Sequence, residues 1–297
     1  MDYLLNNLLA LSHKYYNVPG IKAYDTRGNE HIYTKTTIDP LWVTGNGIYM
    51  PPSSAAYNPV TINTDGGQGL LNSWDGLVEL SKSGYADKVL DVGGTISGTY
   101  TADGVTYDYP WIIMDFRTVE LENGTTYDNV PILQSQYSTH TSFAYYSAQG
   151  QGSWALSDER QWLNSSTNFL SYMPADMISA IHPIKILSNT GSTIDETYNK
   201  FWVASLAEMC FSPNKENSVM WAYYKQLLNT DTLLSGGTYP EMIRYCVHDH
   251  TLGAGMVSVR TSESTYCYFI NANQGAVKPY AMSSAYAASK LPCFALI

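Results

Sequence analysis

The chain has few basic residues and few charged residues of any kind. It contains 16 Lys or Arg against 26 Asp or Glu among 297 residues, which gives a formal net charge of -10 at pH 7. Proteins that bind nucleic acid usually neutralise phosphates with clustered Lys and Arg, and no basic run occurs here. The sequence therefore argues against a nucleic-acid partner.

Long apolar runs are also missing. The first apolar stretch, residues 4–11, is interrupted by Asn6 and Asn7, and the second residue of the chain is acidic. A signal peptide needs a basic start and an unbroken apolar segment, and a membrane-spanning helix needs about 20 apolar residues. We therefore expect neither a signal peptide nor insertion into a membrane.

Cysteine is scarce, and no C-x-x-C pair occurs. The four cysteines are Cys210, Cys246, Cys267 and Cys293. This spacing favours reduced thiols in the core and predicts no cysteine-based metal site. Cys267 and Cys293 would lie near each other if the last two strands paired.

Two histidines flank an aspartate in a spacing that can bind zinc from a strand or loop. They are His248 and His250, but no third ligand can be identified, so solvated loop histidines are the favoured interpretation.

The acidic residues Asp115, Glu120, Glu122 and Asp128 follow a predicted strand and could supply a glycosidase pair or a cation site. Their spacing fixes no carboxylate separation, so a surface role is favoured. No nucleophile elbow, phosphate loop or dinucleotide fingerprint is present, and we expect neither catalytic residues nor a cofactor.

The composition is that of a globular protein with a substantial core. Hydrophobic residues make up 44% of the chain, which also contains 25 tyrosines. With so little charge, the surface must be covered largely by hydroxyl and amide groups. Such surfaces are typical of β-rich extracellular and virion proteins.

The pattern along the chain predicts three parts. Residues 2–16 carry leucines at helical spacing and predict an amphipathic helix, which either docks on its own domain or serves oligomerisation or virion attachment. Residues 21–64 alternate as short strands with turns. Three glycines within residues 65–69 indicate a linker, so we expect a helix over 1–20, a small β module over 21–65 and a larger domain over 66–297.

Local signals predict several elements of the larger domain. Residues 70–83 have the apolar spacing of a helix that ends at Gly84, and Asp103 and Gly104 predict a tight hairpin between two alternating runs. The run 111–114 is apolar on both faces, which favours a central strand. Pro174 is expected at the first position of a short helix that leads to a strand over 184–187.

Two capping patterns and two arginines are predicted to have structural roles. Ser157 is expected to cap a short helix over 157–164, and Ser205 with Glu208 forms a capping-box pattern. Arg160 and Arg260 lie in apolar, Trp-rich segments where an unpaired charge would be costly to bury. We expect each arginine to pair with backbone carbonyls or a carboxylate inside the fold.

Two stretches resemble known families. The segment from Gly45 to Asn63, with Tyr49, Pro51 and Tyr57, resembles a small β module of structural proteins from phages of Firmicutes. The larger domain resembles the DUF6273-type domain of phage and bacterial surface proteins, in the order of its segments and in one specific motif. The motif residues are Trp154, Ser157, Arg160, Trp162, Leu163 and Asn164, followed by Ser205, Glu208, Arg260 and the terminal segment 291–296.

The resemblance implies an α+β fold: a C-type-lectin-like head of mixed antiparallel sheets and short helices, preceded by the helix and the small β-hairpin module. Lectins of this shape bind calcium through a Glu-Pro-Asn type triplet, but here Ser212, Pro213 and Asn214 stand in that pattern, and no Trp-Asn-Asp occurs. A calcium site is therefore not expected. Formylglycine-generating chemistry, found in related folds, needs an activated cysteine pair and is not expected either.

These observations favour a phage virion protein, made in the host cytoplasm and located in the particle, that binds the host surface. Its expected partners are other virion proteins, through the N-terminal helix and β module, and a host cell-surface glycan or protein; a homo-oligomer, with a trimer favoured, is expected. The candidate ligand contacts lie in Tyr-rich loops, namely Tyr145, Tyr146, Tyr245, His248 and His250. A purely structural decoration protein is the alternative, and an enzyme acting on polysaccharide is a third hypothesis.

Overall fold

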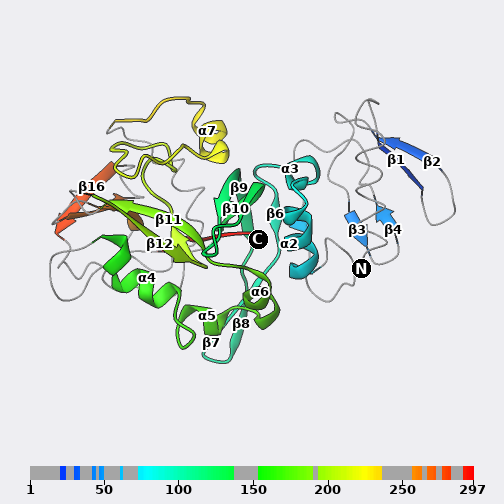
Figure 1. Ribbon diagram of the computed structural model, residues 1–297, viewed down its shortest axis with the longest axis horizontal. Coiled ribbons are helices and arrows are strands. Elements are labelled where there is room, and N and C mark those ends of the chain that lie inside the picture. Colours follow the sequence, from blue (N-terminus) through cyan, green and yellow to red (C-terminus); the bar gives the residue numbers. More distant parts are fainter. Residues whose placement is uncertain are drawn as a thin grey trace.

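The structure is a computed structural model (Figure 1). It describes residues 21–24, 30–33, 42–44, 47–49, 61–62, 73–136, 153–189, 193–235, 256–262, 266–271, 276–281 and 290–297, with side chains only from residue 73 onward. The expected helix over 2–16 and the expected linker over 65–69 lie outside these residues. The fold is mixed α+β, with antiparallel sheets and short helices, which confirms the predicted class.

A six-stranded sheet forms the centre of the larger domain, with the strand order β13-β17-β10-β9-β6-β5. Its middle is a long antiparallel hairpin of β9 (Trp111–Glu120) and β10 (Thr126–Ser135). The strand β17 (Pro292–Ala295) lies between β10 and β13 (Trp202–Val203). Residues far apart in the sequence therefore meet in one sheet.

The other side of the hairpin continues through β6 (Thr95–Ile96) to β5 (Thr61–Ile62), the only parallel neighbour among the strands that the structure describes. The strand β9 is buried at Trp111, Ile113 and Met114, so the prediction of a central strand is confirmed.

Helix α2 (Trp74–Lys82) covers part of this sheet. Ser73 caps it, since the Ser73 hydroxyl accepts a hydrogen bond from the backbone N–H of Gly76 at 3.1 Å. The buried side includes Trp74, whose ring meets that of Phe294 on β17 edge to face, with centroids 5.9 Å apart. Gly84 follows the helix with φ +75°, a conformation that glycine adopts readily. The predicted helix and its end are confirmed within the described range.

The strands β7 (Thr99–Ala102) and β8 (Val105–Asp108) form the predicted hairpin. Asp103 and Gly104, with φ of 52° and 77°, both lie in the left-handed region that a tight two-residue turn requires. Tyr100 of this hairpin is buried among aromatic rings of the core. The rings that pack against it include those of Tyr107, Tyr109, Phe169 and Tyr172.

Helix α3 (Ala86–Val89) follows α2, and four further short helices precede β11: η1 (Trp154–Leu156), α4 (Asp158–Leu163), α5 (Phe169–Tyr172) and α6 (Ala175–Ala180). The prediction for Pro174 is wrong by one position. Its ψ of 135° is extended, so Pro174 caps α6 from outside and the helix begins at Ala175.

The remaining elements flank the central sheet. They are the hairpin of β11 (Ile184–Asn189) and β12 (Ile194–Asn199), helix α7 (Ala222–Leu228), and the sheet of β14 (Met256–Ser262), β15 (Tyr266–Asn271) and β16 (Ala276–Ala281). In Figure 1, α2 lies on one side of the β9–β10 hairpin and β11 with β12 on the other. Near the N-terminus, four short strands form two antiparallel pairs: β1 (Ile21–Tyr24) with β2 (Glu30–Tyr33), and β3 (Trp42–Thr44) with β4 (Gly47–Tyr49).

The last two strands do not pair with each other, contrary to the arrangement that would bring Cys267 and Cys293 together. The strand β16 pairs with β15, which carries Cys267, whereas β17, which carries Cys293, belongs to the central sheet. Cys210, Cys267 and Cys293 are buried free thiols, as predicted, and Cys246 lies outside the described residues. Burial raises the pKa of both Cys210 and Cys267 to about 12.

No helix in the part of the chain that the structure describes is long and apolar enough to cross a membrane.

Candidate ligand-binding pocket

The Trp154 to Asn164 motif is built into the core. The Ser157 hydroxyl accepts a hydrogen bond from the backbone N–H of Arg160 at 3.1 Å, and Trp154 and Leu163 are fully buried. The Arg160 guanidinium donates to Asn199 Oδ1 at 2.6 Å and to the Ala155 carbonyl at 3.2 Å. Burial lowers the pKa of Arg160. The predicted cap and the predicted pairing of this arginine are both confirmed.

Asn164 connects this motif to the segment just before β13. Its amide nitrogen donates to the carbonyls of Arg160 and Phe201, at 3.0 and 2.8 Å. Its oxygen accepts from the backbone N–H groups of Lys200 and Phe201, at 2.9 and 3.2 Å. Both ends of the amide are thus satisfied by backbone, which fixes α4 against the start of β13.

Arg260 on β14 is the other predicted buried arginine, and it is 2% exposed. It donates to Glu208 through two hydrogen bonds, Nη1 to Oε2 at 2.5 Å and Nη2 to Oε1 at 2.6 Å. It also donates to the carbonyls of Val203 at 3.0 Å and Leu187 at 3.2 Å. The two-pronged geometry matches a planar guanidinium to a carboxylate. The prediction that Arg260 pairs inside the fold is confirmed.

Glu208 also completes the predicted capping box. The backbone N–H of Ser205 donates to Glu208 Oε2 at 2.8 Å, and the backbone N–H of Glu208 donates to the Ser205 hydroxyl at 3.2 Å. The predicted capping box is confirmed. The same carboxylate also neutralises Arg260, which the local pattern did not indicate.

A second carboxylate lies near the same guanidinium. Glu216 is fully buried, and its Oε2 accepts a hydrogen bond from the Thr261 hydroxyl at 3.1 Å. Burial raises the pKa of Glu216, the charge of Arg260 lowers it, and the neighbouring Glu208 raises it. Burial is the largest of these effects, so the pKa lies above its ordinary value.

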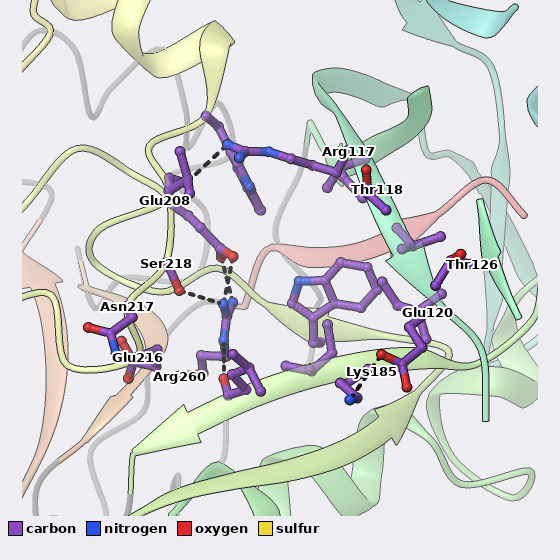
Figure 2. A pocket seen from close by; sticks show the side chains of 18 residues that line it. Arg117, Thr118, Glu120, Thr126, Lys185, Glu208, Glu216, Asn217, Ser218 and Arg260 are labelled. Carbon is purple, nitrogen blue, oxygen red and sulfur yellow. Dashed lines mark hydrogen bonds and ion pairs between the residues drawn. The ribbon is translucent and has the colours of Figure 1, made fainter. Parts of the chain in front are cut away.

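These residues line a pocket of about 350 Å³ between the β9–β10 hairpin, β11 and the loop before α7 (Figure 2). In Figure 2, Glu216 and Asn217 lie on one side of Arg260, and Lys185 with Glu120 lies on the other. The lining consists of Arg117, Thr118, Val119, Glu120, Thr126, Ile132, Ile184, Lys185, Ile186, Leu187, Trp202, Glu208, Glu216, Asn217, Ser218, Val219, Trp221 and Arg260.

The other charged groups of the lining are also held by partners. Arg117 forms an ion pair with Asp115 and donates to the carbonyls of Val219 and Met220, at 3.1 and 2.9 Å. Lys185 contacts Glu120 at 3.0 Å, and a second carboxylate, Glu196, at 3.2 Å. The acidic residues Asp115 and Glu120 thus belong to ion pairs.

Three polar atoms of the lining residues are buried without a hydrogen-bond partner. They are the indole Nε1 of Trp202, the Nε of Arg117 and the Oε1 of Glu216. Buried polar groups are nearly always hydrogen-bonded, to protein, water or ligand. All three atoms have almost no solvent-accessible surface, so they lie enclosed behind the surface of the pocket.

The structure brings together only some of the predicted site residues. Glu208 and Arg260 line the pocket and Ser205 supports Glu208, whereas Trp154, Ser157, Arg160, Trp162 and Asn164 build the core elsewhere. The predicted ligand contacts Tyr145, Tyr146, Tyr245, His248 and His250 lie outside the described residues. Sequence reasoning missed Arg117, Lys185, Trp202 and Glu216. A buried-charge argument like that made for Arg260 could have suggested Arg117, which follows the apolar run 111–114 within β9.

Among the residues with described side chains, no group of three or more His, Cys, Asp or Glu could hold a metal ion. Comparison of the chain with known proteins finds no matching family model, no matching curated protein and no matching solved structure. The resemblance to the DUF6273-type domain therefore stays a prediction.

Proposed function

We propose that the chain is a phage virion protein whose α+β head, of the C-type-lectin-like type, binds a ligand on the host surface through the pocket beside Arg260. The observation that carries this proposal is the 350 Å³ pocket, which is lined by charged side chains that ion pairs hold in place. The phage-type motifs and the Tyr-rich, charge-poor composition support the virion context.

The pocket is pre-organised for binding. Arg260 is held by Glu208 and two carbonyls, and Arg117 by Asp115 and two further carbonyls. Side chains that are already fixed lose little rotamer freedom when a ligand arrives, so more of the contact energy remains as affinity. Val219 is 62% exposed and provides an apolar contact at the edge of the pocket.

The N-terminal part would attach the head to the particle. The short antiparallel pairs β1 with β2 and β3 with β4 lie in the predicted small β module, whose described residues also include β5. In this proposal the module and the preceding segment contact other virion proteins and assemble the chain into a homo-oligomer, for which a trimer is favoured.

One observation favours the alternative of a structural decoration protein. Val105 and Tyr107, which alternate along β8 and so face the same side, are 49% and 39% exposed. Exposed apolar side chains on a hairpin suit contact with a neighbouring subunit. Under this alternative the β7–β8 hairpin is buried between copies in the particle, and the pocket has no host ligand.

Binding of the labelled chain to host and non-host Firmicutes cells tests the proposal. Thr118→Trp would fill the mouth of the pocket, since Thr118 is an exposed lining residue. Thr106→Trp is the matched control, because Thr106 is an exposed strand threonine of β8 outside the lining.

We expect saturable binding to host cells that Thr118→Trp weakens at least tenfold and Thr106→Trp leaves unchanged. Equal binding to host and non-host cells, or an unaffected Thr118→Trp variant, would contradict the proposal. Loss of particle assembly in Thr106→Trp, with no host binding by the natural chain, would favour the decoration role.

A further inference from the structure

We propose that the loop over residues 212–220 is a pH-sensitive latch, which Glu216 holds closed while its carboxyl group is neutral and which opens when Glu216 ionises. This loop leads into helix α7, and its residues 216–219 form one wall of the pocket. The movement of the loop is independent of the proposed function, whereas control of ligand entry by the loop rests on that function.

Glu216 is the anchor of the loop. The structure describes all of residues 212–220, and among them only Glu216 is buried. Asn214 and Ser218 close a small ring around it, since the Asn214 amide donates to the Ser218 carbonyl and the Ser218 N–H donates to Asn214 Oδ1, both at 2.8 Å. The next residue, Asn217, is exposed and has a left-handed φ of 52°, so the chain reverses directly after the anchor. The one side chain that the loop inserts into the fold is thus a carboxylic acid, whose cost of burial depends on pH, unlike that of an apolar side chain.

The surroundings of Glu216 suit its neutral form better than its ionised form. Its Oε2 accepts a hydrogen bond from the Thr261 hydroxyl at 3.1 Å, and its Oε1 is enclosed without a hydrogen-bond partner. The charged groups that act on it are Arg260 of β14 and Glu208 of the segment after β13. Both prongs of the Arg260 guanidinium already bind Glu208, so an ionised Glu216 would be a second negative charge beside one positive charge. The other charged residue of the loop, Lys215, is partly exposed.

The pKa of Glu216 has the direction that the latch requires. Burial, the largest effect, raises this pKa above its ordinary value of 4.5; Arg260 and the hydrogen bond from Thr261 lower it, and Glu208 raises it. In the open loop the carboxyl group is hydrated and has its ordinary pKa. The closed loop is therefore favoured most below about pH 4.5, and this advantage is lost as the pH rises through the raised pKa. Between the two pKa values, the ratio of open to closed loop increases about tenfold per pH unit.

The two ends of the loop are held independently of this anchor. At one end, the backbone N–H of Ser212 donates to the Leu234 carbonyl at 3.1 Å, and at the other, Arg117 donates to the two carbonyls that precede Trp221, at 3.1 and 2.9 Å. Release of the anchor therefore lets the ring move while both ends stay in place. A further hydrogen bond holds the closed ring, from the guanidinium in the centre of Figure 2 to the labelled Ser218, at 3.3 Å.

Hydrogen exchange of backbone amides, followed by mass spectrometry, tests the latch on the natural chain. The protection of residues 212–221 is measured between about pH 4 and pH 7, with exposure times scaled for the intrinsic pH dependence of exchange. We expect this protection to fall at least about fivefold over the range, while the amides of β9 and β10 stay protected. The comparison of loop and central strands does not depend on whether any variant folds.

Two substitutions identify the group that titrates. Glu216→Gln stays neutral and keeps an oxygen that can accept from Thr261, so the protection of its loop should not vary with pH. Glu122→Gln is the matched control, because Glu122 is exposed and lies outside the loop and the lining. Its loop should lose protection as the natural chain does.

Three results would overturn the latch: loop protection that is constant over the range, an equal loss of protection in Glu216→Gln, or a loss that the loop shares with β9 and β10. Failure of the latch and failure of the proposed function are distinguishable. If the loop opens as expected but Thr118→Trp leaves host-cell binding unchanged, the proposed function is wrong and the latch stands. If the pocket binds host cells but loop protection does not vary with pH, the latch is wrong and the proposed function stands.

Discussion

Arg260 and Glu208 lie 52 residues apart in the sequence and meet through two hydrogen bonds of 2.5 and 2.6 Å in the lining of the pocket. The same guanidinium also donates to carbonyls of β11 and β13. One side chain of β14 therefore connects the three-stranded sheet to the central sheet, to the β11–β12 hairpin and to the capping box at Ser205. The pocket lies where these parts join.

Removal of either partner of this pair should strongly destabilise the fold. We expect Arg260→Ala and Glu208→Ala each to lower the free energy of unfolding by about 3–5 kcal/mol, because each leaves a buried charge without its main partner. Urea unfolding measures this change. The double variant should lose less than the sum of the two single variants. Lys82→Ala, which breaks a partly exposed pair with Glu79, is the control and should cost about 0–1 kcal/mol. Strict additivity of the two changes would show that the pair does not couple.

Glu216 should make stability depend on pH. Burial raises its pKa above 4.5 in the folded chain, so the folded state binds the proton more tightly than the unfolded state does. The stabilisation that this gives is present below the unfolded pKa and is lost as the pH rises through the folded pKa. Glu216→Gln cannot ionise and keeps an oxygen that can accept from Thr261. Its free energy of unfolding, relative to the natural chain, should therefore increase between about pH 4 and pH 7. A constant or decreasing difference over this range would contradict the assignment.

The helix cap at Ser157 should contribute measurably to stability. Ser157→Ala removes the acceptor for the Arg160 N–H and the hydroxyl that donates to the Trp154 carbonyl at 2.9 Å. We expect a loss of about 0.5–2 kcal/mol in thermal or urea unfolding. Ser171→Ala, at an exposed serine of α5, is the matched control and should change stability by less than about 0.5 kcal/mol. Equal effects of the two substitutions would rule out a special role for the cap.

Replacement of Asn164 by aspartate, which has nearly the same shape, should destabilise the fold. Asn164→Asp keeps the shape but loses the amide donor, so the Arg160 and Phe201 carbonyls would face a carboxylate oxygen. A loss of about 1–3 kcal/mol or more is expected from the unsatisfied buried groups. Asn168→Asp is the control, since the Asn168 side chain makes no capping hydrogen bond to α5. A neutral Asn164→Asp variant would show that the connection to β13 does not matter for stability.

Short-range features of this fold could be predicted from the sequence. The turn at Asp103 and Gly104, the cap at Ser157 and the capping box at Ser205 each depend on residues within a few positions, and each is confirmed. The start of α6 was misplaced by one residue, because proline is compatible both with the first helical position and with the extended residue before it.

Long-range features could not be predicted in the same way. The two buried arginines were expected to have partners, but no pattern along the chain identifies Glu208 as the partner of Arg260 or places Glu216 beside them. The strand β17 pairs with both β10 and β13, and this arrangement depends on packing between distant segments. Arg117, Lys185 and Trp202 are likewise assembled into one pocket only by the fold.

The most direct test of the central claim, that the head binds its ligand through this pocket, is an NMR titration that follows the indole N–H signals of the seven tryptophans. The signals missing from Trp202→Phe and Trp154→Phe identify those two residues. When the full chain is titrated with polysaccharide fragments from host cells, the account predicts that the Trp202 signal shifts saturably while the Trp154 signal stays in place. A Trp202 signal that does not move while the fragments saturate the protein would contradict the account.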